Sequence, residues 1–233
     1  MVVALLLLLA APADRPAANA TAAAAPALFA SESLLYTLNW PTGLSLGEGR
    51  MRATHDGGEW RFELGLDASL PGFEITDSFR STAAGEFCST EFVKQSVHGP
   101  RRASETTTYD SETGIATRET ANGGGKSEMR FSGCARDALA YLYFLRHELA
   151  HGRIPAPQTV YFGAPYTVKV GYGGEQSIRV GDKPYTADRV IASFKGPASS
   201  STFEMFFARD AARTLLLVRV PFSLGTFSME LAR

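Results

Sequence analysis

One short motif in the sequence could bind a metal ion, in the stretch RHELAHG at residues 146–152. His147, Glu148 and His151 follow the order His-Glu-x-x-His, which zinc peptidases use on a helix. Residues four apart share one face of a helix, so both imidazoles could bind a zinc ion while the carboxylate activates a bound water as general base. The motif therefore raises the hypothesis of a zinc-dependent peptidase with Glu148 as catalytic residue and the two histidines as ligands.

The residues after this motif do not supply the third protein ligand that a catalytic zinc requires. Metzincins carry that ligand six residues after the second histidine, with a glycine between, and here Pro157 and Ile154 occupy those positions. The next glutamate, Glu175, lies in a glycine-rich stretch between expected strands. We therefore favour two partly exposed histidines near a helix C-terminus, where cations suit the helix dipole, and keep the zinc peptidase as the alternative. Apart from zinc under that alternative, no cofactor is expected.

Other signals for catalysis or nucleic-acid binding are weak. The sequence has no Gly-x-Ser-x-Gly motif, and its glycine-rich stretches at 123–125 and 171–174 lack the Lys-Ser/Thr ending of a phosphate loop. The formal net charge is -1, which creates no field that would attract nucleic acid. We expect a protein that is not an enzyme and has no nucleic-acid partner.

The first residues predict export from the cytoplasm. An apolar run over residues 2–11 is followed by the small-residue pattern Ala-Pro-Ala, which signal peptidase accepts. The run is about half of the ~20 residues that a helix needs to cross a bilayer, so no transmembrane span is expected in the mature chain. Alanine and proline dominate the next residues, up to Ala30. Residues 1–32 are thus predicted to be signal peptide and flexible leader, and residues 33–233 a single β-rich domain in the periplasm or cell envelope.

Cys88 and Cys134 are the two cysteines of the chain. In an exported protein an even, low count favours one disulfide between them. The alternative is two separate buried thiols. Neither cysteine belongs to a Cys-x-x-Cys pair, so a thioredoxin-like redox role is not indicated.

Alternating hydrophobicity predicts a mainly β protein. Between residues 59 and 68, Trp60, Phe62 and three further apolar residues alternate mainly with charged ones, which is the period of a half-buried strand. Asp-Gly-Gly at 56–58 predicts a hairpin over residues 43–68. Further strands are expected at 34–40, 75–81, 87–97, 102–110, 114–120, 126–131, 166–172, 178–180, 185–194, 202–207, 214–220 and 226–231, with a Gly-Gly turn at 173–174.

One segment has helical periodicity. Residues 135–151 contain no Gly or Pro and carry apolar residues at helical spacing, and Gly152 and Pro155 end the helix. We expect this apolar stripe to face the core, and the face with His147 and His151 to lie away from it. About a dozen strands around this helix predict a mainly β fold, an antiparallel curled sheet or partly open β-barrel with one α-helix near residues 135–151. The stripe consists of Ala138, Leu142, Leu145 and Leu149.

Four segments carry a family resemblance. They are YTLNWPTGLSLGEG at 36–49, DSFRS at 77–81, DALAYLYFLR at 137–146 and FEMFFARDAARTL at 203–215. In this order they resemble an exported bacterial family catalogued as domain of unknown function 3108, over roughly residues 33–233. The resemblance implies an exported, mainly antiparallel β domain and no established activity.

The helix motif of that family bears on the peptidase hypothesis. It centres on Tyr143, Leu145 and Arg146 and does not require the two histidines, so the resemblance weighs against a metal site. The chain departs from the pattern where Leu215 stands near the last strands in place of an expected proline.

Export, alternating strands and an incomplete catalytic constellation together predict a non-enzymatic binding or assembly module of the cell envelope. The apolar concave side of a curled sheet could hold a hydrophobic, lipid-like molecule. Another envelope protein is the second partner considered. Phe203, Phe206 and Phe207 are expected to belong to the core.

Overall fold

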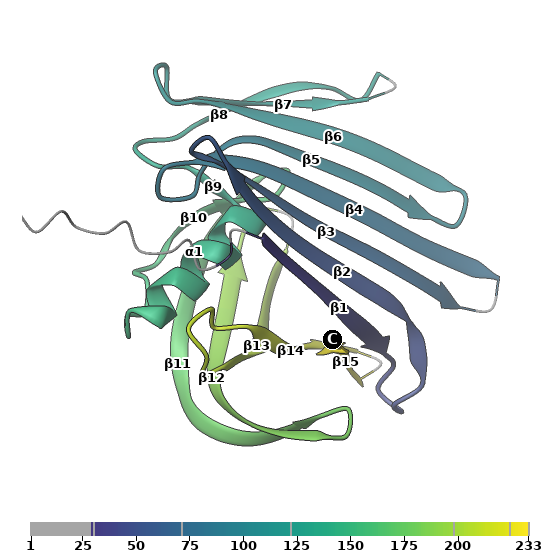
Figure 1. The fold of residues 1–233 in the computed structure, drawn as a ribbon. Helices are drawn as coiled ribbons and strands as arrows, with labels where there is room; N and C mark the ends of the chain where they lie inside the picture. The colour runs from purple at the N-terminus through teal and green to yellow at the C-terminus, as the bar shows by residue number, and fades with distance from the viewer. Residues whose placement is uncertain are drawn as a thin grey trace, which may run out of the picture.

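The computed structural model describes residues 29, 31–70, 72–121, 123–197, 199–223 and 225–232. Most of the predicted signal peptide and leader therefore lies outside the described residues. Within them, fifteen strands form one sheet and a single helix packs against it (Figure 1). The described part of the chain contains no helix whose length and hydropathy would let it cross a membrane.

The first half of the sheet contains β1 (Ser31–Asn39), β2 (Ser45–Asp56), β3 (Glu59–Leu70), β4 (Phe73–Ala84), β5 (Cys88–His98), β6 (Arg101–Asp110), β7 (Ile115–Thr120) and β8 (Gly125–Arg130). The second half contains β9 (Arg136–Asp137), α1 (Ala138–Ala150), β10 (Gln158–Tyr161), β11 (Pro165–Val180), β12 (Lys183–Lys195), β13 (Ser200–Ala208), β14 (Leu215–Phe222) and β15 (Gly225–Leu231).

The strand order is β8-β7-β6-β5-β4-β3-β2-β1-β15-β14-β13-β12-β11-β10-β9, so β1 and β15 join two meanders. Neighbouring strands are antiparallel except β9 and β10, which are parallel. The edges β8 and β9 do not pair with each other, so the sheet is curled but not closed. The predicted fold class, a curled antiparallel sheet with one helix, is confirmed.

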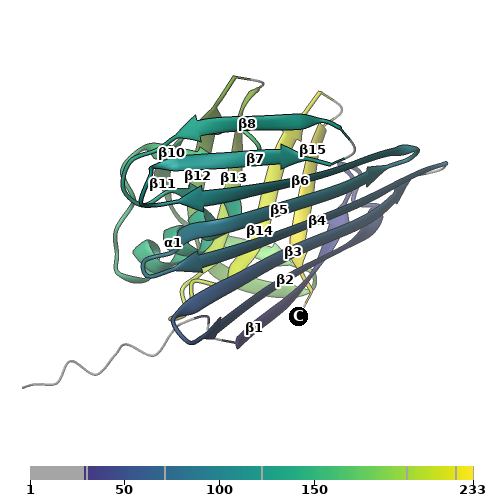
Figure 2. The ribbon, with the colours of Figure 1, turned by 90° about the horizontal axis from the view of Figure 1, so that it is seen from above.

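The sheet curls far enough for its edge strand β9 to approach β5, a strand of the other half of the sheet. The amide of Ser89 in β5 donates a hydrogen bond to the carbonyl of Ala135, just before β9, at 2.9 Å. Beyond this seam, β7 and β8 lie over the β10–β11 hairpin (Figure 2), where Arg118 donates to the carbonyl of Gly163 at 2.6 Å. The predicted disulfide between Cys88 and Cys134 is present and ties the same seam.

Side chains alternate across the strands as the sequence predicts. Trp60 and Phe62 are buried, whereas Arg61 and Glu63 between and after them are exposed. Buried residues of most strands form the main core on the concave side, and a smaller cluster of Val180, Ala187, Phe206, Leu216 and Leu217 packs separately. The pattern therefore fixes which face of the sheet is concave and apolar.

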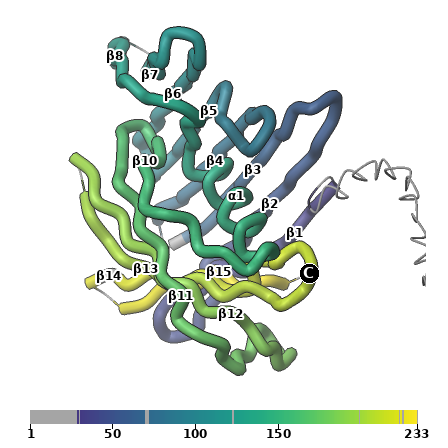
Figure 3. Tube along the Cα trace, turned by 90° about the vertical axis from the view of Figure 1, so that its left-hand side faces the viewer, coloured from purple at the N-terminus to yellow at the C-terminus, as the bar shows by residue number. Residues whose placement is uncertain are grey.

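The helix lies inside the curl, between β3 and β4 on one side and β9 and β10 on the other (Figures 1 and 3). The carboxylate of Asp137 caps its N-terminus by accepting from the amides of Leu139 and Ala140, at 2.8 and 3.1 Å. At the other end Gly152 adopts a left-handed conformation, φ 70°. The helix is shorter than the predicted 135–151 because Arg136 and Asp137 belong to β9.

The predicted burial of the helix is wrong in one respect. Leu145 and Leu149 are buried as expected, but Ala140, on the face predicted to lie away from the core, is fully buried too. Sheet surrounds the helix on several sides, so it buries more than one stripe. His147 and His151 are partly and largely exposed, as predicted.

Two local predictions also need correction. Gly173 and Gly174, predicted as a turn between strands, lie within the long strand β11, where the register with β12 shifts between Tyr172 and Glu175. Gly174 has φ 89°, which a glycine accepts at such a bulge. The short strands β9 and β10 were not predicted.

Candidate ligand-binding site

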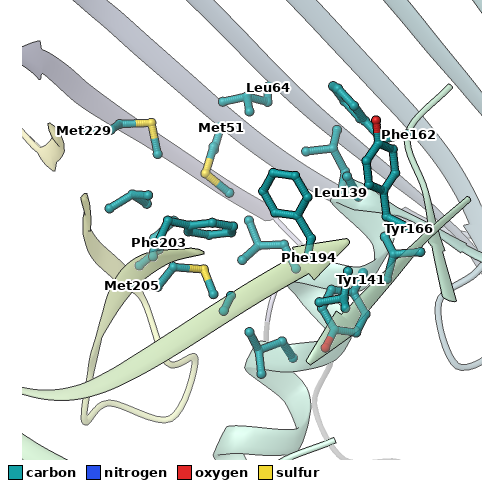
Figure 4. Close-up of a pocket in the computed structure, with 18 of the residues that line it drawn as sticks. Met51, Leu64, Leu139, Tyr141, Phe162, Tyr166, Phe194, Phe203, Met205 and Met229 are labelled. Carbon is teal, nitrogen blue, oxygen red and sulfur yellow. The ribbon is translucent and has the colours of Figure 1, made fainter. Parts of the chain in front are cut away.

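The concave side of the sheet contains a cavity of about 490 Å³ (Figure 4). Its wall combines α1 with strands from both halves of the sheet. The lining residues are Met51, Leu64, Ala138, Leu139, Tyr141, Leu142, Leu145, Val160, Phe162, Tyr166, Val168, Ala192, Phe194, Ser199, Phe203, Met205, Leu215, Val218 and Met229.

The cavity runs from the helix to the protein surface. Leu145 in α1 and Leu215 in β14 are fully buried, with exposures of 0% and 1%. Ser199, in the turn between β12 and β13, is exposed. The wall of the cavity thus includes fully buried residues of α1 and β14 and an exposed residue of the β12–β13 turn.

Among the described residues that line the cavity none carries a charge, and the polar side chains are Ser199, Tyr141 and Tyr166. Burial raises the pKa of Tyr141 to about 12, an effect that Arg136 partly opposes, so the phenol is neutral at physiological pH. The lining is therefore mainly apolar, an environment that favours hydrocarbon over water.

A buried ion pair holds the helix against the sheet. The guanidinium of Arg146 is fully buried and donates to both carboxylate oxygens of Glu32 in β1, at 2.7 and 2.6 Å. Its Nε donates to the carbonyls of Ala212 and Arg213, at 3.2 and 3.0 Å. The hydroxyl of Tyr143 donates to Glu32 at 3.1 Å. This network links α1, β1 and the turn between β13 and β14.

The N-terminus of the helix is fixed by a second buried group. One carboxylate oxygen of Asp137 accepts from the hydroxyls of Ser81 and Ser89, each at 2.6 Å. Burial raises the pKa of Asp137, while the hydrogen bonds from these serines act in the opposite direction. Because Asp137 also caps α1, the same carboxylate fixes the start of the helix and joins it to β4 and β5.

The motif residues His147, Glu148 and His151 do not line the cavity. They line a separate hollow of about 620 Å³ together with His55, Trp60 and aromatic and charged neighbours. Glu148 is engaged by Arg153, whose Nε and Nη2 donate to its two oxygens at 2.8 and 2.6 Å.

This arrangement bears directly on the peptidase alternative. The hydrogen bonds from Arg153 lower the pKa of Glu148, which makes its carboxylate a weaker base. Among the described residues, no group of three or more His, Cys, Asp and Glu side chains is placed to hold a metal ion. The described residues therefore place His147, Glu148 and His151 together but add no third protein ligand of the kind that a catalytic zinc needs.

Sequence reasoning missed Glu32 and most cavity residues. Glu32 fell inside the predicted leader, and β1 begins at Ser31, two residues before the predicted domain boundary. The cavity walls come from residues as distant as Met51 and Met229. One signal did point here: the family motif centred on Arg146, which is the buried end of the ion pair.

Comparisons with known proteins agree with the fold. The model of a family described as "Protein of unknown function (DUF3108)" matches residues 35–232. No curated protein matches the sequence. The crystal structure of a beta-barrel-like protein of domain of unknown function DUF1849 from Brucella abortus is similar, with a TM-score of 0.62 and 8% identity, over 88% of this chain and 97% of that chain. At this identity the likeness concerns the fold alone.

Proposed function

Because the chain belongs to DUF3108, a family of proteins of unknown function, we propose a function from its geometry: an exported binding protein of the cell envelope that holds the hydrocarbon part of a lipid-like molecule without converting it. The observation that carries this proposal is the cavity of about 490 Å³, which includes an exposed residue and whose described lining residues are all uncharged. Its size falls within the roughly 300–1,000 Å³ typical of small-molecule sites.

The lining selects for hydrocarbon. Each methylene moved from water into the cavity contributes about 0.8 kcal/mol, so a chain of about twelve methylenes gains roughly 10 kcal/mol. Association costs about 4 to 15 kcal/mol in lost translational and rotational freedom. A short hydrocarbon chain therefore does not bind, and a long one does. The polar head of such a molecule stays outside, near Ser199, because the interior offers few hydrogen-bond partners.

Two features support an envelope location. The apolar run at residues 2–11 has the form of a signal peptide. The disulfide between Cys88 and Cys134 suits an oxidising compartment outside the cytoplasm. An assembly role with another envelope protein stays a prediction for which the geometry supplies no specific surface.

A series of saturated fatty acids of increasing length tests the proposal. Binding is measured by isothermal titration with the purified protein, its disulfide intact. The dissociation constant should fall about fourfold for each added methylene and then become constant when the cavity is full.

A variant pair separates cavity binding from surface adsorption. Ala192 lines the cavity, whereas its neighbour Ile191 points to the other face of β12. Ala192→Phe should abolish binding of the longer chains, and the matched control Ile191→Phe should keep it. Affinity that does not depend on chain length, or that survives Ala192→Phe in the folded protein, would contradict the proposal.

A further inference from the structure

Two imidazoles on the outer side of α1 lie close enough to share a ligand. His147 and His151 are one helical turn apart, and their ring centres are 4.4 Å apart with an angle of 48° between the rings. They line the hollow of about 620 Å³ and not the cavity proposed for hydrocarbon. Any ligand that the two imidazoles bind is therefore independent of the proposed lipid-binding function.

In both rings the Nδ1 atom faces an oxygen. Nδ1 of His151 lies 2.8 Å from the carbonyl oxygen of His147. Nδ1 of His147 lies 3.5 Å from a carboxylate oxygen of Glu148. A proton on each Nδ1 satisfies these oxygens and leaves the lone pair on Nε2, which is how proteins commonly orient histidines that bind metal ions.

The distance between the rings selects a coordination geometry. With metal–nitrogen bonds of about 2.0–2.1 Å, two imidazoles at 90° have ring centres about 4.5 Å apart, and two at the tetrahedral angle about 5.2 Å. If both Nε2 atoms bind one ion, the observed separation of 4.4 Å corresponds to cis positions at about 90°. That angle suits the tetragonal geometry of Cu²⁺ or Ni²⁺ better than tetrahedral Zn²⁺.

We propose that His147 and His151 bind a divalent transition-metal ion through their two Nε2 atoms, with Cu²⁺ the preferred ion. Both rings line the hollow, so water in it can fill the remaining coordination positions. Copper also binds nitrogen donors most tightly among the divalent ions of the first transition row.

The site is a binding site and not the peptidase centre suggested by the motif. Glu148 lies beside the imidazoles, but its carboxylate is held by Arg153. The ion would thus lack a free general base. The disulfide occupies both cysteines of the chain, so no thiol competes for copper or reduces it.

The test is a titration of the full chain, without a histidine tag, with Cu²⁺ and separately with Zn²⁺. We expect one Cu²⁺ per chain, bound more tightly than Zn²⁺, with an electron paramagnetic resonance spectrum that reports two imidazole nitrogens. His147→Ala or His151→Ala should weaken Cu²⁺ binding at least about tenfold. Losing a group that only hydrogen-bonds to a metal ligand already lowers metal affinity by about that factor. Both side chains are at least partly exposed, so these variants are expected to fold.

His55→Ala is the matched control. His55 lines the same hollow but stacks on Trp60, with ring centres 4.2 Å apart, so its loss should leave Cu²⁺ affinity unchanged. No stoichiometric Cu²⁺ binding, equal binding by the His147→Ala/His151→Ala double variant, or tighter binding of Zn²⁺ would each overturn the proposal. A loss in His55→Ala as large as in His147→Ala would also overturn it.

Discussion

Replacing Arg146 with methionine should destabilise the protein strongly. The guanidinium is fully buried and donates to Glu32 and to the carbonyls of Ala212 and Arg213. Methionine fills similar space but leaves the Glu32 carboxylate, 12% exposed, without its cation. Breaking one partner of a buried pair costs about 3–5 kcal/mol, which is a large fraction of the roughly 5–15 kcal/mol by which proteins are stable.

A double-mutant cycle isolates the pair from the packing of the helix. Glu32→Gln alone should also destabilise, because Arg146 then stays buried without a counter-charge. The double variant Arg146→Met/Glu32→Gln should cost at least about 2 kcal/mol less than the sum of the two single variants. The free energy of unfolding is measured by urea denaturation at neutral pH, with the disulfide intact. Additive costs within about 0.5 kcal/mol, or a cost below about 1 kcal/mol for Arg146→Met, would show that the ion pair does not hold the helix.

Three further predictions concern the seam and the helix. Cys88→Ser/Cys134→Ser opens a loop of 46 residues and should cost about 4 kcal/mol in urea denaturation; a cost near zero would contradict the role of the disulfide. Asp137→Ala removes the helix cap and leaves the O–H groups of Ser81 and Ser89 without their acceptor, so a loss of about 3 kcal/mol is expected in the same assay, and a neutral variant would contradict it. Burial and His151 hold the pKa of His147 below its ordinary value of 6.5, so the unfolded chain binds a proton more readily and stability should decrease as pH falls below 6.5. His147→Gln should reduce this slope in unfolding curves recorded at several pH values, and an unchanged slope would contradict the assignment.

The sheet could be predicted from sequence because local patterns determine it. Trp60 and Phe62 alternate with charged residues, and that alternation alone places them on the buried face. The Gly173–Gly174 pair shows where local patterns fail. Two glycines indicate a turn as readily as a bulge, and the pairing of β11 with β12 on both sides of Tyr172 decides between them.

The cavity could be predicted as a class of site but not as a set of residues. An apolar concave face follows from alternation, whereas the residues that share one cavity depend on how fifteen strands curl. Glu32 and Arg146 are 114 residues apart, and neither has a local pattern that indicates the other. The histidine motif posed the opposite difficulty. Its spacing is local and visible, but its chemistry depends on Arg153, which holds Glu148.

The most direct test of the proposed binding function is mass spectrometry of an organic extract from the protein, purified after export with its disulfide formed. We predict that the wild-type protein carries a lipid with a long hydrocarbon chain, and that the folded variant Ala192→Phe, with its cavity filled, carries none. Extracts without lipid from both proteins, or with equal lipid from both, would contradict the proposal that the cavity holds hydrocarbon.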